Sequence, residues 1–245
     1  MKISLFLVFV FYTTDPQFQQ FYRLFGTYLP AVSAKGGYLH LRLGNPEKAL
    51  EEFGKAWDIA VDQEWLSSQR WVLYWKGLTY LQMKSVDEAQ RVAVELREMI
   101  EKGIYKKSIR IYYLLMGLIE FEKDNIFKAV EYLEKAVRSL PYQDYSPGPH
   151  ATFIYSLALA YYEAEDFDKA LEEYERIVAL TTGRLSYGDI YAKSFFMLGK
   201  IYEQQGNTAK AIENHEKFLS LWKDADPGIA EVEDAKKRLA GLQDN

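Results

Sequence analysis

Three histidines are the side chains of this sequence best suited to acid–base chemistry or metal binding. His40, His150 and His215 are far apart, and no two of them have the spacing of a metal-binding pair. His40 and His215 stand at helical positions where equivalent segments carry tyrosine, which favours a role in packing helices together. Cysteine is absent, so thiolate nucleophiles, thiolate metal ligands and disulfides are all excluded. We therefore expect no metal site and no catalytic residue.

Paired carboxylates and adjacent glycines are the remaining candidates for chemistry. Glu51-Glu52 and Glu172-Glu173 have lysine or arginine neighbours at the spacing of helical ion pairs, which explains them without catalysis. Gly36-Gly37 lies in a segment of helical periodicity and lacks the pattern of a phosphate-binding loop. No segment has the pattern of a serine nucleophile elbow. The sequence predicts a protein that is not an enzyme and needs no cofactor, with a small-molecule function as the least favoured hypothesis.

Composition limits the classes of partner. The 245 residues are 49% hydrophobic and 16% aromatic, which is enough apolar material for a large core. The net charge of −5, without any long basic run, argues against nucleic acid or an anionic membrane as the main partner.

The amino terminus permits two interpretations. Lys2 precedes the apolar run Ile3 to Tyr12, which is the order found in secretory signals. Residues 13–20 lack a small-x-small cleavage site, and the run is shorter than the roughly 20 residues that span a bilayer. We expect residues 1–30 to form an apolar helix that packs on the rest of a cytoplasmic protein. The alternative is export to the periplasm or beyond, with residues 1–14 acting as a signal or anchor.

Small residues at fixed spacing reveal an internal repeat. In five places a glycine or alanine stands twelve residues before an alanine, and successive alanines are 40, 40, 41 and 41 residues apart (89 − 49, 129 − 89, 170 − 129, 211 − 170). The pairs are Gly37 and Ala49, Gly77 and Ala89, Gly117 and Ala129, Ala158 and Ala170, and Gly199 and Ala211. The pattern predicts five units, at residues 31–63, 70–102, 110–141, 151–182 and 192–223.

Each unit has the pattern of two amphipathic helices separated by a turn. Asn45 before Pro46 is typical of a helix start, and Ser85 with Glu88 has the form of a capping box. Small residues on both helices would let the two backbones approach closely, with tyrosines such as Tyr80 beside the contact.

These residues carry a family resemblance. Tyr113-Leu114-Leu115-Met116-Gly117, followed by Ala129, Ala136 and Pro141, is similar to a tetratricopeptide repeat, and Leu198-Gly199, Tyr202, Gly206 and Ala211 match it again. The resemblance covers residues 31–223, although the period exceeds the usual length of about 34 residues. It implies an all-α fold, a right-handed α-solenoid of helical hairpins. The charged, amphipathic segment at 226–245 is expected to be its carboxyl-terminal capping helix.

A stripe of apolar and aromatic residues on the first helices is the predicted binding site. Positions −3, +1 and +4 from each small residue lie on one side of the helix, and in a repeat array the first helices line the concave surface. The predicted partner-binding groove consists of Tyr74, Leu78, Leu114, Leu118, Phe121, Tyr155, Leu159, Tyr162, Phe196 and Lys200. The alternative is that the array buries this stripe against itself or against the amino-terminal helix. Lys193 and Lys200 form a weaker candidate site for an acidic group.

The function expected from the resemblance is a scaffold that binds a protein or peptide segment in this groove. The alternative is a structural or sensor arm of a longer bacterial signalling or regulatory protein, such as a kinase, a cyclase or a transcription regulator. The carboxyl-terminal tail is similar to those of such repeat arms.

Overall fold

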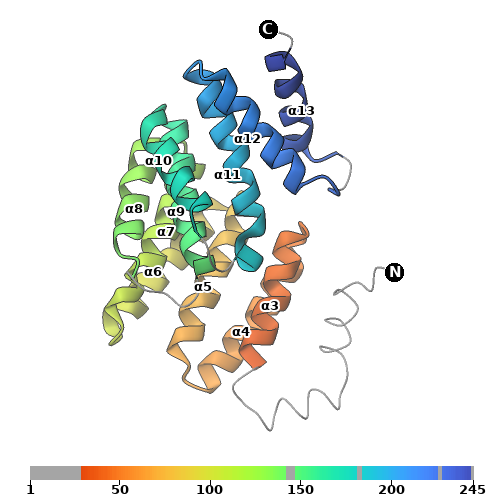
Figure 1. Ribbon diagram of the computed structural model, residues 1–245. Coiled ribbons are helices and arrows are strands. Elements are labelled where there is room, and N and C mark those ends of the chain that lie inside the picture. The colour runs from red at the N-terminus through yellow and green to blue at the C-terminus, as the bar shows by residue number, and fades with distance from the viewer. Residues whose placement is uncertain (1–28, 142–146, 181–183, 226–227, 244–245) are drawn as a thin grey trace. The chain divides into compact units, whose positions relative to one another are not determined.

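The computed structural model describes residues 29–141, 147–180, 184–225 and 228–243 (Figure 1). The apolar run at residues 3–12 and the signal predicted at residues 1–14 lie outside this part of the chain. Within it every regular element is helical and none is a strand, which confirms the prediction of an all-α fold.

The helices form two compact units that divide within one helix, and each unit is described by itself. Unit 1 ends at Leu115 and unit 2 begins at Met116. Unit 1 contains α3 (Leu29–Arg42), α4 (Pro46–Asp62), α5 (Leu66–Gln82), α6 (Val86–Lys102), the short 3-10 helix η1 (Lys106–Ser108) and the first half of α7 (Ile109–Glu122). Unit 2 contains the rest of α7, α8 (Ile126–Arg138), α9 (Pro147–Glu163), α10 (Phe167–Val178), α11 (Arg184–Gln204), α12 (Thr208–Leu221) and α13 (Ala230–Gln243).

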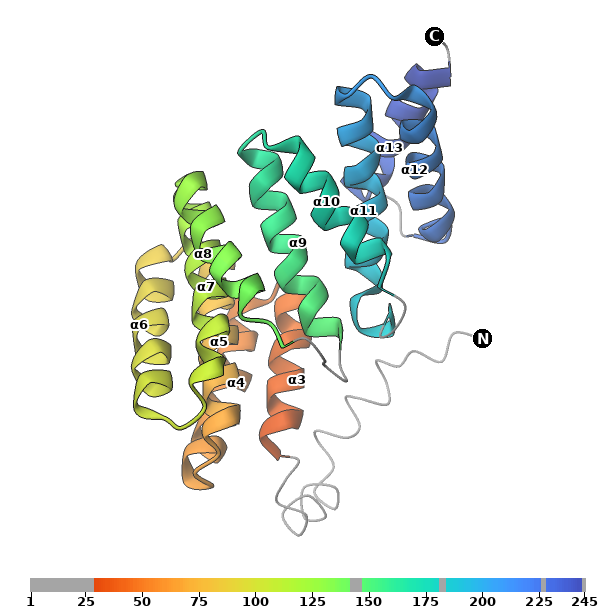
Figure 2. The ribbon, with the colours of Figure 1, turned by 60° about the vertical axis from the view of Figure 1, so that its left-hand side comes forward.

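Within each unit the helices stack in chain order. In unit 1, α3 packs on α4, α4 on α5 and α5 on α6; in unit 2 each helix from α8 to α13 packs on the next (Figure 2). The carboxyl-terminal helix α13 lies against α12, as α11 lies against α10. It therefore continues the stacking order of unit 2 by one further helix.

The turns inside the hairpins are short because one residue in each takes a left-handed conformation. Gly44, Lys84, Asp124, Glu165 and Gly206 have φ between 58° and 73°. The amide of the following residue then bonds back to a carbonyl five positions earlier, as from Ser85 to Tyr80 at 2.8 Å. This is the Schellman ending of a helix, and it satisfies carbonyls that would otherwise lack a partner.

Helix starts differ from the expected capping pattern in part. Pro46 is at the first position of α4, as expected, but neither Asn45 nor Ser85 makes a side-chain cap. The predicted capping box at Ser85 is therefore wrong. Side-chain caps form instead at Asp166 and Asn207, whose oxygens accept from the amides three residues on.

Glycine contacts explain the close packing of the helix pairs. A methyl group built on Gly117 would stand 2.5 Å from Leu133, and one on Gly199 would stand 2.6 Å from His215, so only hydrogen fits at either position. Each partner lies on the second helix of the same hairpin, four residues after the repeated alanine. In these two hairpins of unit 2, a large side chain of the second helix occupies the space beside a glycine of the first helix.

One hairpin of unit 1 reaches the same density in another way. Its second helix carries Ala93 where the other hairpins carry a larger residue. Leu115 of α7 fills the space, because a methyl group on Gly77 would lie 2.6 Å from its side chain. The small residue at position 77 therefore makes room for the following repeat, in contrast to Gly117 and Gly199.

Candidate functional site

The predicted groove residues of unit 1 are mostly buried. Tyr74 is 2% exposed and Leu114 is 1% exposed, whereas Leu78 is half-buried. Burial raises the pKa of the Tyr74 phenol well above its usual value, so the group stays neutral. Only Leu78 of these three contributes appreciable side-chain surface.

Two tryptophans of α5, which the predicted groove did not include, are aromatic residues with exposed surface near Leu78 in the sequence. Trp71 and Trp75 on α5 are half-buried, with ring centroids 6.5 Å apart. Tyr38 of α3 is 39% exposed and packs on Trp75 at 4.8 Å. Trp71 and Trp75 precede Gly77 by six and two positions. A sequence prediction that also included positions −6 and −2 from each small residue would have found them.

In unit 2 the predicted residues of α9 are half-buried. Tyr155, Leu159 and Tyr162 lie along one side of this helix, where Tyr155 meets the ring of Tyr174 at 5.8 Å and Tyr162 meets Phe167 at 5.4 Å. Burial raises the pKa of Tyr155 to about 12, helped by the nearby carboxylates of Glu231 and Asp189. The phenol is therefore a neutral hydrogen-bonding group at the edge of an apolar surface.

Lys200 joins the face of α9 to that of α11. Its ammonium lies 4.8 Å from the ring centroid of Tyr162 and 5.6 Å from that of Phe196. Phe196 itself is 6% exposed and packs on Phe218, with ring centroids 5.3 Å apart. The predicted residues of these two helices are thus in contact, and a cation lies between two rings.

The other predicted residues are placed as follows. Leu118 and Phe121 of α7 are both half-buried in unit 2. Lys193 donates to Glu231 of α13 at 2.6 Å, so it is paired with a carboxylate of its own chain. Because Lys200 is engaged with rings, the two lysines do not form a joint site for an acidic group.

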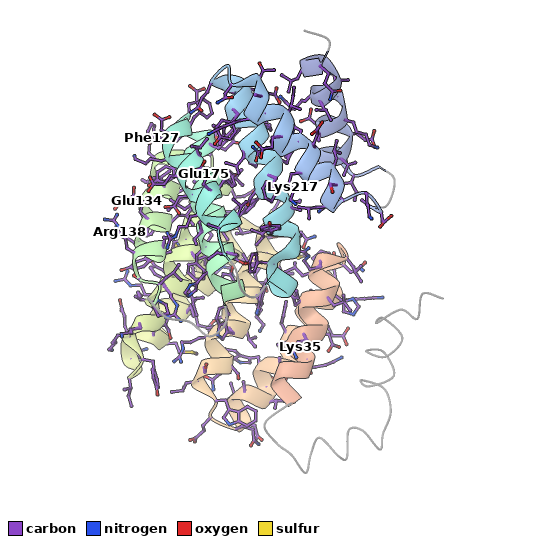
Figure 3. The ribbon with its side chains drawn as sticks, in the orientation of Figure 1. Lys35, Phe127, Glu134, Arg138, Glu175 and Lys217 are labelled. Carbon is purple, nitrogen blue, oxygen red and sulfur yellow. The ribbon has the colours of Figure 1, made fainter. Side chains whose placement is uncertain are left out.

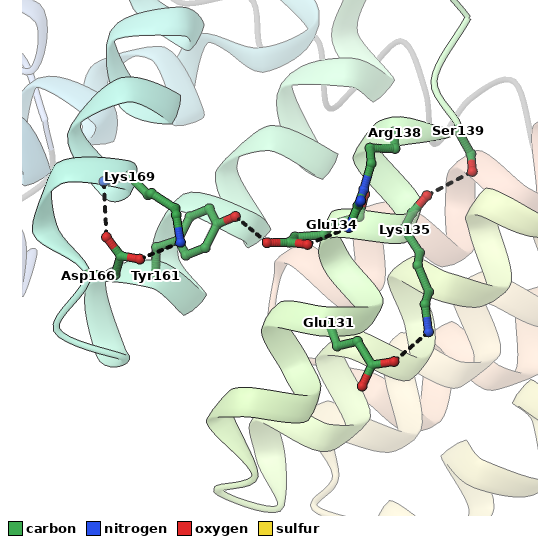
Figure 4. A network of polar contacts seen from close by, with 8 residues as sticks. All are labelled: Glu131, Glu134, Lys135, Arg138, Ser139, Tyr161, Asp166 and Lys169. Carbon is green, nitrogen blue, oxygen red and sulfur yellow. Dashed lines mark hydrogen bonds and ion pairs between the residues drawn. The ribbon is translucent and has the colours of Figure 1, made fainter.

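A polar contact recurs between neighbouring hairpins of unit 2. The Tyr161 hydroxyl donates to Glu134 at 2.7 Å, and the Tyr202 hydroxyl donates to Glu175 at 2.8 Å. In each case a tyrosine of a first helix reaches the preceding second helix, 27 residues back. Figure 4 shows the first of these contacts, together with the ion pair of Glu134 and Arg138. Figure 3 places Glu134 on α8 and Glu175 on α10.

The hollow beside the first of these contacts has no unpaired charge. It lies between α8, α9 and α10, has a volume of about 480 Å³ and includes Glu134, Arg138, Glu173 and Arg176 in its lining. Arg138 pairs with Glu134, and Arg176 pairs with Glu173 at 3.2 Å. Burial raises the pKa of Glu173. Internal pairing makes this hollow a poor site for a charged substrate.

The histidine most deeply placed in unit 2 is structural. His215 is fully buried, with Nε2 2.5 Å from the carboxylate of Glu203, whose other oxygen accepts from Arg238 at 3.0 Å. These contacts join α11, α12 and α13. No solvent reaches the imidazole, so the site fits the packing role expected from the sequence.

The described residues contain neither a cluster suited to a metal ion nor a helix suited to a membrane. Among them no three histidine or acidic side chains gather in a way that would hold a metal ion. Nor does any of their helices combine the length and apolarity needed to span a bilayer.

Comparison with known proteins decides the family. Two models of the tetratricopeptide repeat match, one at residues 114–184 and the other at 150–224. Residues 114–224 belong to the tetratricopeptide repeat family. The matched segments contain the α9 and α11 faces and both tyrosine–glutamate contacts.

Solved tetratricopeptide structures show the same fold at low identity. A thermophilic tetratricopeptide protein of Thermus thermophilus is 19% identical, with a TM-score of 0.56, over 87% of this chain and 98% of its own. A signal transduction ATPase with numerous domains from Pyrococcus horikoshii, which has a tetratricopeptide repeat sensor, is 17% identical over 97% of this chain, with a TM-score of 0.62. The Cut9–Hcn1 hetero-tetramer of APC/C gives 13% identity over 95% of this chain and a TM-score of 0.63.

Some of these relatives are longer than this chain. It spans 41% of the matched chain in the Cut9–Hcn1 structure and 35% of the Pyrococcus ATPase. No curated protein matches the sequence. The comparisons therefore establish the family and the fold, and leave the partner to be argued from the site.

Proposed function

We propose that this protein is an interaction scaffold that binds an apolar or aromatic protein segment on the first helices of its hairpins. Tetratricopeptide repeats in general bind protein partners, which supports the coarse assignment. The proposal of a specific binding surface rests on the contact of Lys200 with Tyr162 and Phe196. This contact brings predicted groove residues of α9 and α11 together.

The chemistry of this surface favours a segment with apolar anchors. Tyr155, Leu159 and Tyr162 each keep part of their surface in water, and Tyr155 and Tyr162 are held in place by neighbouring rings. Rigid aromatic side chains lose little conformational freedom on binding, so most of the gain from desolvation is retained. Lys200 adds one cation, which would favour a partner residue with a carboxylate or carbonyl beside its apolar anchor.

Selection from a displayed library of random peptides tests this proposal. The immobilised protein should enrich peptides with apolar anchors, and the variant Leu159→Ser/Tyr162→Ala should lose affinity for them by at least about tenfold. Val94→Ser is the matched control, because Val94 is 48% exposed on α6 and belongs to unit 1, whereas the proposed face belongs to unit 2. Selected peptides that bind the α9 variant as tightly as the original protein would contradict the proposal, provided that circular dichroism shows both to be helical.

A second candidate function is that of an arm within a longer signalling or regulatory protein, where the same face would be covered by another part of that protein. The similarity to the repeat-containing Pyrococcus ATPase, of which this chain spans 35%, is the observation that favours it. In that case the library selection would yield no specific peptide. Hydrogen exchange in the natural full-length protein would then show the α9 face to be more protected than in the isolated chain.

A further inference from the structure

A loop at one end of unit 1 exposes two large apolar residues. Ile104 is 92% exposed and Tyr105 is 72% exposed, in the connection between α6 and η1. Apolar side chains that lie mostly in water at a loop tip add little to the stability of the folded protein. Such exposure is typical of residues that become buried on binding.

The same loop is strongly basic. Lys102, Lys106, Lys107 and Arg110 lie within nine residues, and no acidic residue occurs from Lys102 to Ile119. The carboxyl end of α6 also lies here, with Lys102 in its last turn. Because the protein as a whole has a net charge of −5, this concentration of positive charge is a local feature and not a general property of the surface.

A buried arginine without a carboxylate lies beneath the loop. Arg70 of α5 is 5% exposed, and a methyl group built on Gly103 would stand 3.9 Å from its Nη1. Within the described residues, no carboxylate pairs with it. Burial lowers the pKa of Arg70, and the neighbouring Tyr105 opposes this effect. A guanidinium in this setting gains more than an exposed lysine from an added carboxylate.

From these observations we infer that the α6–η1 loop is a second interaction surface, which binds an acidic protein segment with an apolar anchor. The anchor would pack on Ile104 and Tyr105, and its carboxylates would pair with the cations of residues 102–110 and with Arg70. The loop belongs to unit 1 and the aromatic face of α9 and α11 belongs to unit 2. The two proposals therefore rest on different residues and stand or fall independently.

The charges around the loop favour a protein segment over a lipid bilayer. Asp62 and Glu64 in the turn between α4 and α5, and Glu98 and Glu101 on α6, belong to the same unit. The turn between α4 and α5 lies at the same end of unit 1 as the loop (Figure 2), and Glu98 accepts a hydrogen bond from Lys102 at 3.2 Å. A flat anionic membrane would meet them together with the lysines, whereas a narrow peptide can contact the basic loop alone.

Fluorescence anisotropy with two labelled peptides tests the inference on the whole protein. One peptide consists of repeated Glu-Glu-Leu-Phe units and the other of repeated Lys-Lys-Leu-Phe units. We expect the acidic peptide to bind, with an affinity that falls as salt is added, and to protect amides of residues 102–110 from hydrogen exchange. Ile104→Ser/Tyr105→Ser should weaken this binding by at least about tenfold. Phe127→Ser is the matched control, since Phe127 is 87% exposed on α8 (Figure 3) and should have no effect.

Arg70→Met separates a binding role from a structural one. Removal of a buried cation that has no carboxylate should leave the melting temperature unchanged or raised, while affinity for the acidic peptide falls. A lower melting temperature with unchanged affinity would remove Arg70 from the proposed surface.

Three results would overturn the inference as a whole. The first is the absence of binding by the acidic peptide at millimolar concentration. The second is equal binding of both peptides. The third is that vesicles of phosphatidylcholine and phosphatidylserine protect the loop while the peptide does not, which would assign the surface to a membrane.

Discussion

At the residue scale, the helices of three hairpins approach closely because a glycine faces a large side chain of the second helix. Gly37 faces Phe53, Gly117 faces Leu133 and Gly199 faces His215, each at a distance that leaves no room for a methyl group. The role of these glycines is therefore steric. None of the three takes a positive φ, in contrast to Gly44 and Gly206 in the turns.

Gly117→Ala should lower stability by roughly 1–3 kcal/mol, since the added methyl group would lie 2.5 Å from Leu133 and force the helices apart. Gly54→Ala is the control. Gly54 is inside α4, and a methyl group there meets nothing within 4 Å, so this change should stabilise the helix by about 0.5–1 kcal/mol. Urea unfolding of the two variants should therefore shift in opposite directions. A neutral Gly117→Ala would show that α7 and α8 pack less closely than described.

The tyrosine–glutamate contacts between hairpins are a second residue-scale device. Tyr161→Phe and Tyr202→Phe should each cost about 0.5–1.5 kcal/mol, because the hydrogen bond from the phenol to the carboxylate is lost. Tyr80→Phe is the matched control. Tyr80 occupies the same repeat position, but Gly54 stands where Glu134 and Glu175 stand in the other hairpins. Thermal unfolding that shows equal effects for all three variants would contradict this assignment.

At the element scale, much of the fold was predictable because the spacing of small residues reports helix pairing directly. Gly117 and Ala129 can stand twelve residues apart on adjoining helix faces only if a turn separates them, so the hairpins and the family follow. What remained unpredictable depends on neighbouring repeats. The alanine at position 93 leaves a space that Leu115 of the next helix fills, and no pattern within one repeat contains that information.

The candidate site was predictable in outline only. Position −3 lies about 60° around the helix from the small residue and position +1 about 100° away, given 100° per residue. Three of the four predicted residues at −3, Tyr74, Leu114 and Phe196, are buried, and Tyr155 is the exception. Leu78 and Lys200 at +1 keep some exposure. Which ring covers which depends on side-chain sizes across several helices, and so Trp71 and Trp75 were missed.

The carboxyl-terminal helix α13 gives an element-scale prediction about pH. The hydrogen bond from Lys193 holds the pKa of Glu231 below its ordinary value of 4.5. A carboxyl with a lowered folded-state pKa adds stability above its unfolded pKa, and that stability is lost as pH falls through the folded value.

Lys193→Met should therefore destabilise α13 at neutral pH by less than about 1 kcal/mol, because the pair is partly exposed. The difference from the original protein should shrink as pH falls below about 4.5. Hydrogen exchange of the α13 amides measures this difference. If the difference in α13 stability between the two proteins stayed constant from neutral pH down to pH 3, the ion pair of Lys193 and Glu231 would not be what stabilises the helix.

At the scale of the whole molecule, the main helix contacts are local in the sequence. Within each unit a helix packs on its neighbours, or on the helix two elements away, as α3 does on α5 and α9 does on α11. In repeat proteins of this kind, stability is approximately a sum of terms for single repeats and for adjacent pairs. Damage to one hairpin should then stay near that hairpin.

Gly199→Ala tests this property, because the added methyl group would lie 2.6 Å from the buried ring of His215. We expect amides of α11, α12 and α13 to exchange faster, while those of α3, α4 and α5 keep their protection. Gly37→Ala, with Phe53 at 2.6 Å, is the reciprocal variant and should loosen α3 and α4 alone. If either change lowered protection equally along the chain, the protein would unfold as one cooperative body, and the additive description of its repeats would be wrong.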